Sequence, residues 1–152
     1  MRGKMRAGLS LLLCLVLCLG AAGAAGSRDL TNQEGQAMRL ERLGLFLGVG
    51  EDETGFTDFD LDRAPSREEA VTMLVRALGK GTEAAEMGKT HPFTDVPAWA
   101  DGYVSYAYDQ GLTKGTSDTT FGAGDTATGA MYVTFMLRAL GHADGTDFTW
   151  DD

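Results

Sequence analysis

The chain has 152 residues, with 22 Asp and Glu against 13 Lys and Arg, for a formal net charge of −9 at pH 7. Such an acidic chain argues against nucleic acid and anionic membrane surfaces as partners, because both are bound through basic patches. Its two cysteines, Cys14 and Cys18, lie near the N-terminus, so the rest of the chain offers neither a disulfide nor a thiolate nucleophile.

Residues 1–25 have the pattern of a secretory signal peptide. A positive head precedes an apolar run at residues 9–19 and a stretch of Ala and Gly at residues 21–25. The apolar run is too short to span a bilayer, which needs roughly 20 residues. We therefore expect a secreted protein that is cleaved after Ala24 or Ala25 and loses both cysteines with the leader.

The first predicted helix covers residues 36–47, where apolar side chains recur at helical spacing and Gly48 supplies a stop. Residues 51–62 are acidic and rich in turn formers. We expect a loop there that Phe56 and Phe59 fasten to the core.

A second helix is predicted from Ser66 to Gly79, and its start is clearly marked. Ser66 and Glu69 stand at the spacing of a capping box, in which each side chain accepts a hydrogen bond from the backbone N–H group of the other residue. Residues 81–92 are rich in Gly, Thr and Glu and are interpreted as a linker, with room for a short helix at residues 83–87.

The second half of the chain repeats the first. Val71-Thr72 and Arg76-Ala-Leu-Gly79 return as Val133-Thr134 and Arg138-Ala-Leu-Gly141, at a constant offset of 62 residues (133 − 71). Self-similarity at such a period indicates stacked supersecondary units that bury their apolar faces against each other. We expect a helix at residues 100–110, then a turn, then a helix at 129–140.

Several spaced motifs in these units occur together. They are Phe93-Thr-Asp-Val96, Trp99-Ala100, Gly111-Leu112, Gly115, Phe121 and Met136–Gly141 in the second unit, and Ser66-Arg-Glu-Glu69 in the first. This set resembles the S-layer homology (SLH) repeat, whose signature Thr-Arg-Ala-Glu is similar to residues 66–69. The second unit departs from the signature, because Thr128-Gly-Ala-Met131 has neither its arginine nor its glutamate.

The resemblance implies an all-α fold of two helix–loop–helix repeats packed together, at residues 33–80 and 93–142. Residues 143–152 then read as a truncated third unit that starts near Trp150, because the family usually carries three repeats. Two units should leave apolar seams around Leu40, Leu43, Tyr103 and Tyr106 partly uncovered. We therefore expect those seams to support self-association or docking to further sequence downstream.

The resemblance also implies a function. SLH modules hold secreted proteins on the cell wall or S-layer by binding secondary cell-wall polysaccharides non-covalently, and these polymers often carry pyruvate ketals. The expected partner is such a polymer, with no cofactor. No enzyme is expected, because His91 and His142 lie far from any plausible serine nucleophile. Two alternatives stay open: a calcium-binding, dockerin-like interaction module, and a structural or oligomerising surface protein with a decayed glycan site.

Arg67 is the leading candidate for binding the polymer. With Ser66 as the N-cap it occupies the first helical position, where a cation opposes the helix dipole. Free backbone N–H groups beside a guanidinium would make a pocket for a carboxylate, such as that of a pyruvate ketal. The structural alternative is a surface arginine paired with Glu68 or with an acidic loop residue.

Trp99, Asp95 and Lys114 complete the predicted polymer site together with Ser66 and Arg67. Trp99 either stacks on a sugar ring or fills the seam between the units. Arg76 and Arg138 recur within the helix bodies and are interpreted as structural, with apolar stems covering the core and charged heads paired with acidic residues.

An acidic pattern in the first unit raises a metal hypothesis. Asp58, Asp60, Asp62 and Glu69 occupy positions 1, 3, 5 and 12 of a calcium-binding loop. Arg63, however, replaces the glycine that makes the sharp turn at position 6, and Glu69 is already used by the capping box. The prediction is therefore that no metal binds, with these four carboxylates as the calcium alternative.

Overall fold

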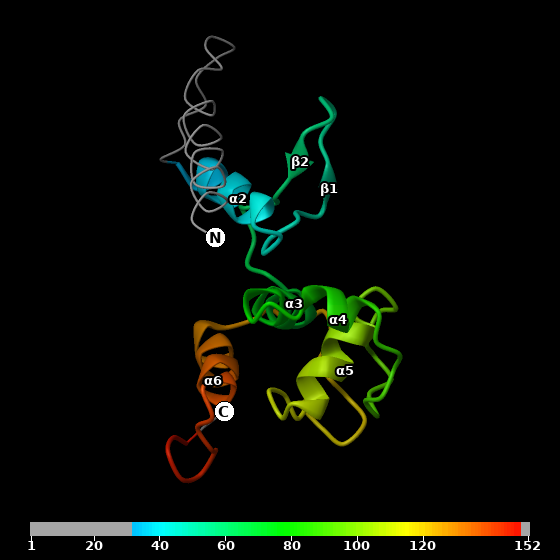
Figure 1. Ribbon diagram of the computed structural model, residues 1–152, viewed down its shortest axis with the longest axis vertical. Coiled ribbons are helices and arrows are strands. Elements are labelled where there is room, and N and C mark those ends of the chain that lie inside the picture. The colour runs from blue at the N-terminus through cyan, green and yellow to red at the C-terminus, as the bar shows by residue number, and fades with distance from the viewer. Residues whose placement is uncertain (1–31, 150–152) are drawn as a thin grey trace, which may run out of the picture.

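The structure is a computed structural model that describes residues 32–149, and most of its regular elements are helices (Figure 1). In chain order the elements are α2 (Gln33–Arg42), β1 (Gly50–Glu51), β2 (Thr57–Asp58), α3 (Arg67–Ala77), α4 (Gly81–Ala85), α5 (Asp101–Asp109) and α6 (Gly129–Ala139). Among the described residues, no helix has the length and apolar character of a membrane span. The predicted signal peptide and Trp150 lie outside the described residues.

The all-α expectation needs one correction, because the acidic segment at residues 51–62 is not a simple loop. It contributes to a short antiparallel hairpin in which Gly50 pairs with Asp58 and Glu51 with Thr57. Phe59 is 7% exposed and its ring lies 5.4 Å from that of Phe46, whereas Phe56 is 52% exposed. Of the two predicted anchors, only Phe59 is buried, since Phe56 lies on the loop that joins the two strands.

Helices α2, α3, α5 and α6 all end on a glycine in the left-handed conformation, namely Gly44, Gly79, Gly111 and Gly141. At the end of α3, the N–H of Gly79 donates to the carbonyl of Arg76 and that of Lys80 to Val75, at 2.9 and 3.1 Å. Glycine adopts this positive φ without the steric cost that a side chain would add. The repeated glycines therefore set where these helices stop.

Helix α2 is displaced from its predicted position at residues 36–47. It begins earlier, because the side chain of Asn32 accepts a hydrogen bond from the N–H of Gly35 at 2.8 Å and so caps the start. It ends at Arg42, because Gly44 and not Gly48 closes the last turn, with its N–H donating to the carbonyl of Glu41 at 2.7 Å. The apolar spacing continued past the true end of the helix.

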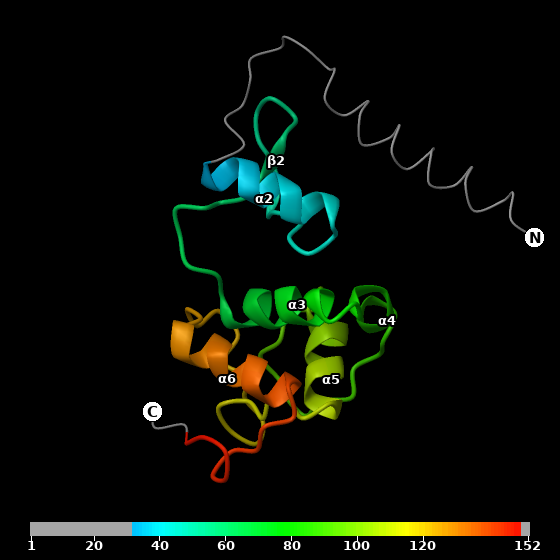
Figure 2. The same ribbon diagram turned by 60° about the vertical axis from the view of Figure 1, so that its left-hand side comes forward.

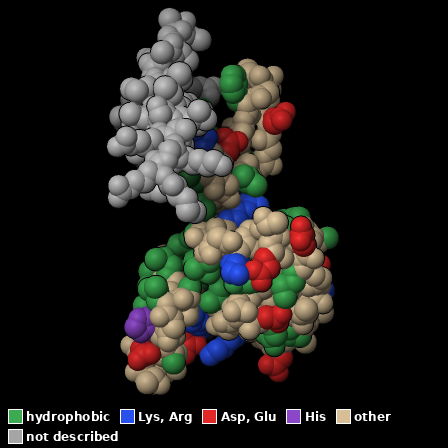
Figure 3. Space-filling model, viewed as in Figure 1, with side chains coloured by type: hydrophobic (Ala, Val, Ile, Leu, Met, Phe, Trp, Pro, Cys, Tyr) green, Lys and Arg blue, Asp and Glu red, His purple; other side chains and the backbone are tan. Residues whose placement is uncertain are grey.

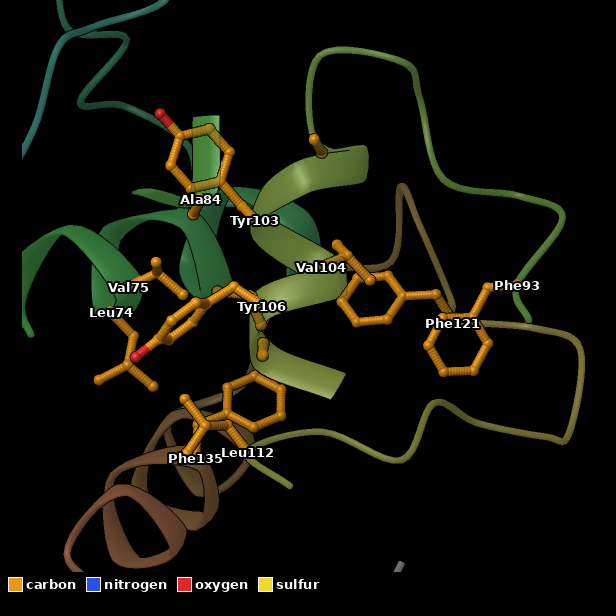
Figure 4. Packing of buried hydrophobic residues seen from close by; sticks show 13 residues of the cluster. Leu74, Val75, Ala84, Phe93, Tyr103, Val104, Tyr106, Leu112, Phe121 and Phe135 are labelled. Carbon is orange, nitrogen blue, oxygen red and sulfur yellow. The ribbon is translucent and has the colours of Figure 1, made fainter. Parts of the chain in front are cut away.

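Helix α3 is the centre of the fold, since it contacts α4, α5 and α6 (Figure 2). Helix α2 and the hairpin lie on the opposite side of α3 from α5 and α6 in both views. The main core lies between α3, α5 and α6 and the loops around them (Figure 4). Its largest fully buried side chains belong to Phe93, Phe121 and Phe135.

Tyr103 and Tyr106 belong to this core, contrary to the expectation that they line an uncovered seam. Each is 9% exposed. They are covered because α3 and the short helix α4 both pack on α5. Gly102 permits this approach, since a Cβ atom there would collide with the carbonyl oxygen of Ala84.

The apolar surface that remains exposed lies elsewhere. On α2 and just after it, Leu40 and Leu43 are 43% and 70% exposed, as the sequence led us to expect. On α6 and just after it, Val133 and Leu140 are 53% and 74% exposed, and Figure 3 shows hydrophobic side chains gathered over that part of the molecule. Further exposed apolar side chains lie in and around the hairpin, among them Leu47, Val49, Phe56 and Leu61, so α2 and α6 carry only part of the exposed apolar surface.

Candidate functional site

The start of α3 has the capping box that the sequence predicts. The hydroxyl of Ser66 accepts from the N–H of Glu69 at 3.4 Å, and Glu69 Oε2 accepts from the N–H of Ser66 at 2.7 Å. Arg63 also binds Glu69, since it donates a hydrogen bond to each of the two carboxylate oxygens at 2.7 Å. These hydrogen bonds from Arg63 are the main reason that the pKa of Glu69 falls to about 2. Ser66 and Glu69 thus hold the helix start in place.

Arg67 is buried between two aromatic rings of the second half of the chain. It is 7% exposed, and its guanidinium carbon lies 5.1 Å from the centroid of the Phe121 ring and 5.2 Å from that of Phe135. A cation held against ring faces is attracted by their electron density, more strongly when water is excluded. Arg67 is therefore a residue of the seam between the two halves, and not an exposed surface arginine.

Two of the backbone N–H groups at this helix start are already used, which changes the predicted mode of binding. The N–H of Arg67 donates to the carbonyl of Asp125 at 2.8 Å, and that of Glu69 to Ser66. The side chain of Glu68 accepts from the N–H of Gly124 at 2.9 Å. Recognition of an anion here would consequently fall to the guanidinium and not to the N–H groups of the helix.

Asp95 holds the loop that reaches the start of α3. One of its carboxylate oxygens accepts from the N–H of Phe121 at 2.8 Å, and the other from those of Gly122 and Ala123 at 2.8 and 3.0 Å. Burial alone would raise the pKa of Asp95, but these three hydrogen bonds outweigh it and hold the pKa below its usual value. Asp95, which the sequence predicted to contact the polymer, thus fixes the loop at residues 121–123 in the structure.

A pocket of about 230 Å³ opens beside Arg67, and we call it the arginine pocket. It is lined by Arg67, Gly115, Thr116, Met131, Thr134, Phe135 and Arg138. At Gly115 the wall is bare backbone, because φ is 75° and a Cβ atom would collide with the ring of Phe93. Two guanidinium groups from α3 and α6 thus line one small pocket of a chain that is acidic overall.

Arg138 and Lys114 share a single carboxylate at the edge of the arginine pocket. Arg138 donates to Asp144 through Nε at 3.2 Å and Nη2 at 2.6 Å, and Lys114 Nζ lies 2.8 Å from Asp144 Oδ2. Hydrogen bonds from Arg138 and then Lys114 lower the pKa of Asp144 to about 2. Arg138 and Lys114 together thus carry one positive charge more than the carboxylate that they share.

A second pocket, of about 480 Å³, lies on the other side of α3, and we call it the tryptophan pocket. It is lined by Phe46, Leu47, Gly48, Val49, Phe59, Asp60, Leu61, Arg63, Pro65, Glu69, Thr72, Met73, Arg76 and Trp99. Trp99 is 54% exposed. The predicted polymer residues are therefore divided between two places, with Arg67 in one pocket and Trp99 in the other.

The two pockets lie over matching faces of α3 and α6. Glu69, Thr72, Met73 and Arg76 line the tryptophan pocket, and the residues 62 positions later, Met131, Thr134, Phe135 and Arg138, line the arginine pocket. Spacings of three and four residues put each set on one side of its helix. The repetition of Thr and Arg in the sequence was the available signal for this pairing.

Arg76 and Arg138 are both partly buried but differ in what their heads contact. Arg138 pairs with an acidic residue, as the sequence interpretation proposed. Arg76 instead lies over the ring of Tyr103, with its guanidinium carbon 5.1 Å from the centroid, and donates to the Tyr103 hydroxyl at 3.3 Å. The ring takes the place of the acidic partner expected for Arg76.

The four carboxylates of the calcium alternative do not converge on one point. Arg63 Nε donates to Asp60 while its other nitrogens hold Glu69, and Asp58 accepts from the N–H of Asp60 at 2.9 Å. Within residues 32–149, no three Asp, Glu, His or Cys side chains are placed to hold a metal ion. Arg63, which stands where a calcium loop needs glycine, occupies the space between the carboxylates.

Comparison with known proteins agrees with the sequence motifs. Residues 92–130 match the S-layer homology domain. The chain is 34% identical over 134 residues to a middle cell wall protein of Brevibacillus brevis, 35% over 116 residues to a surface layer protein of Brevibacillus choshinensis, and 32% over 140 residues to a cell surface protein of Thermoanaerobacter kivui. No solved structure matches the chain.

These matches take in 86%, 74% and 86% of this chain but only 12%, 10% and 18% of the respective relatives. The chain therefore spans between about a tenth and a fifth of the length of the relatives it matches. The similarity concerns one part of each of these larger proteins.

Proposed function

This chain carries an S-layer homology domain at residues 92–130, and we propose from it that the chain holds a secreted protein on a bacterial cell wall by binding an anionic wall polysaccharide without a covalent bond. Relatives named as cell wall, surface layer and cell surface proteins support a location at the outside of the cell. The predicted signal peptide provides the route of export.

The observation that carries the proposal is the placement of Arg67 and Arg138 in one pocket. Arginine presents a planar fork of N–H donors that matches a carboxylate, and its charge acts more strongly where water is excluded. The ligand group would be a carboxylate on the polymer, such as that of a pyruvate ketal. Arg67 and Arg138 would contact this group together, with Arg138 also holding Asp144 at the edge of the site.

The experiment compares binding of the purified chain to cell-wall sacculi before and after mild acid removes ketal pyruvate. Arg67→Met keeps an apolar side chain between Phe121 and Phe135 but removes the guanidinium. We expect it to weaken binding to untreated sacculi by about tenfold or more, since a hydrogen bond to a charged group contributes roughly 1.5–3 kcal/mol.

Arg42→Met serves as the matched control. It makes the same change of charge at an exposed position in the last turn of α2, away from both arginines of the pocket. Its binding should equal that of the parent chain. If Arg67→Met melts like the parent and still binds untreated sacculi with the parent affinity, the assignment of the arginine pocket is wrong.

A further inference from the structure

His91 lies on the linker between α4 and α5, and its side chain is fully buried. Its Nε2 atom lies 3.1 Å from Oδ1 of Asp101, and its Nδ1 atom accepts a hydrogen bond from the N–H of Phe93 at 3.2 Å. Because Nδ1 is an acceptor, it carries no proton, and the ring donates from Nε2 to the carboxylate. Both ring nitrogens are therefore satisfied only while the imidazole is neutral.

A second proton on the His91 ring would break one of these hydrogen bonds. It would turn Nδ1 from an acceptor into a donor. The N–H of the ring and the N–H of Phe93 would then face each other across a distance of 3.2 Å, where the buried side chain has no access to water. Since buried donors without a partner destabilise the folded chain, protonation favours a state in which the ring and Phe93 separate.

The surroundings of His91 also favour the neutral ring. The main charged side chains that act on it are Asp101 on α5, Lys89 on the linker and Asp95 on the following loop. Burial, and then the charge of Lys89, hold the pKa of His91 below its usual value of 6.5, although Asp101 and Asp95 act in the opposite direction. The folded chain thus binds this proton more weakly than the unfolded chain does. The stability that the neutral ring provides is complete above about pH 6.5 and is lost as the pH falls below it.

Phe93 connects His91 to the arginine pocket. Its ring is fully buried, with the centroid 5.2 Å from that of His91 and 5.7 Å from that of Phe121 (Figure 4). Phe121 is one of the two rings that hold Arg67. The ring of Phe93 also fills the space beside Gly115, which lines the arginine pocket. A shift of Phe93 would therefore reach the pocket both through its wall and through the ring beside its arginine.

We propose that His91 is a pH-sensitive switch, which holds Phe93 and the wall of the arginine pocket in place at neutral pH and releases them when the ring takes a second proton. The chain would then bind its polymer at neutral pH and release it in a mildly acidic medium. The effect on polymer binding rests on the proposed function, whereas the release of Phe93 does not. The sequence has two histidines, His91 and His142, and histidine is the side chain that ordinarily changes charge between about pH 5 and pH 7.

The first experiment tests the switch without any polymer. NMR of the purified chain follows the ring of His91 and the amide of Phe93 from about pH 7 to about pH 5. The ring should titrate below about pH 6.5. Over the same range the protection factor of the Phe93 amide, which corrects for the intrinsic effect of pH on hydrogen exchange, should fall by about fivefold or more. An unchanged protection factor would overturn the switch.

The second experiment measures binding to untreated sacculi at about pH 7 and pH 5, where carboxylates of ordinary pKa stay largely ionised. His91→Asn offers an amide oxygen to the N–H of Phe93 but cannot take up a proton. His142→Asn is the matched control, since it removes the other imidazole at a half-exposed position outside both pockets. The parent chain and His142→Asn should bind about fivefold more weakly at the lower pH, and His91→Asn should change by less than about twofold. Titration of the sacculi themselves would affect all three chains equally.

The two experiments separate failure of this inference from failure of the proposed function. If the parent chain binds sacculi at neither pH, the proposed function fails and the effect on binding falls with it, while NMR still decides whether Phe93 is released. If the parent binds equally at both pH values, or if His91→Asn shows the pH dependence of the parent, the switch is wrong and the proposed function stands. Loss of Phe93 protection without weaker binding would also overturn the inference, because His91 would then not act on the pocket.

Discussion

Helices α3 and α6 are counterparts in the repeat. Comparing their first turns distinguishes the residues that cap a helix from those that contact other parts of the chain. Both have 11 residues and begin after a capping residue, Ser66 in α3 and Thr128 in α6. In α6 the box is closed by a sulfur atom, because the N–H of Thr128 donates to Sδ of Met131 at 3.4 Å. A capped helix start therefore does not require the charged residues found in α3.

Those charged residues make contacts away from their own helix. Arg67 packs between rings from the second half, Glu68 holds the N–H of Gly124, and Glu69 binds Arg63. Of their counterparts in α6, Gly129 and Ala130 are exposed, and the uncharged Met131 is half-buried. The difference shows that the charged start of α3 serves the seam and the two pockets, while the cap alone serves the helix.

The largest loss of stability is expected for a substitution on α6 at its contact with Arg67. Phe135 is 2% exposed and its counterpart Met73 is half-buried at the tryptophan pocket. Phe135→Ala should lower the free energy of unfolding by about 3–5 kcal/mol, because it leaves a cavity in the core and removes one ring beside Arg67. Met73→Ala should cost clearly less. Urea unfolding of both variants measures the difference, and equal losses would show that the two faces are equally buried.

The next effect concerns the two caps. Ser66→Ala removes the acceptor for the N–H of Glu69 and should cost about 1–2 kcal/mol, whereas Thr128→Ala should cost about 0.5–1 kcal/mol. The reason is that α3 contacts three other helices, so fraying of its first turn disturbs more of the core. Thermal unfolding of the two variants tests this order. A larger loss of stability for Thr128→Ala would show that the first turn of α6, and not that of α3, contributes more to the fold.

A smaller, pH-dependent effect follows from Glu69. Its pKa is lowered in the folded chain from its usual value of 4.5 to about 2, chiefly by Arg63. A carboxyl with a depressed folded pKa stabilises the fold above its unfolded pKa, and this stabilisation is lost as the pH falls from about 4.5 towards 2. Glu69→Gln should therefore show a weaker decline of melting temperature between about pH 5 and pH 3 than the parent, because this range covers the upper part of that change. Parallel declines would mean that the contact contributes little.

The smallest change in stability is expected for a substitution that makes the start of α6 resemble the start of α3. Met131→Glu replaces a weak sulfur acceptor with a carboxylate, which also interacts favourably with the helix dipole. We expect a gain of about 0.5 kcal/mol in the free energy of unfolding but weaker polymer binding, since residue 131 lines the arginine pocket and a carboxylate there would repel an anionic ligand. Denaturant titration and sacculus binding test the two parts. A gain in binding would indicate that the glutamate of the signature acts on the ligand directly.

Contacts within a few residues were predictable from the sequence alone. The capping box at Ser66 and the positions of α5 and α6 follow from local patterns, because a cap and a glycine stop act within one helical turn. The start and end of α2 were missed, although both signals are local. Asn32 was overlooked as a cap, and apolar spacing continued to Leu47, so Gly48 looked like a better stop than Gly44.

Contacts between distant residues were decided by the tertiary structure. The sequence showed Arg67 and Trp99 as candidate ligands, but only the packing of α3 between its neighbours places them in different pockets. The same packing buries Tyr103 and Tyr106 and brings Phe121 and Phe135 to Arg67. Local pattern determines the helices and their ends, because those hydrogen bonds join near neighbours. Burial and the grouping of charges depend on residues tens of positions apart, and therefore only on how the helices pack.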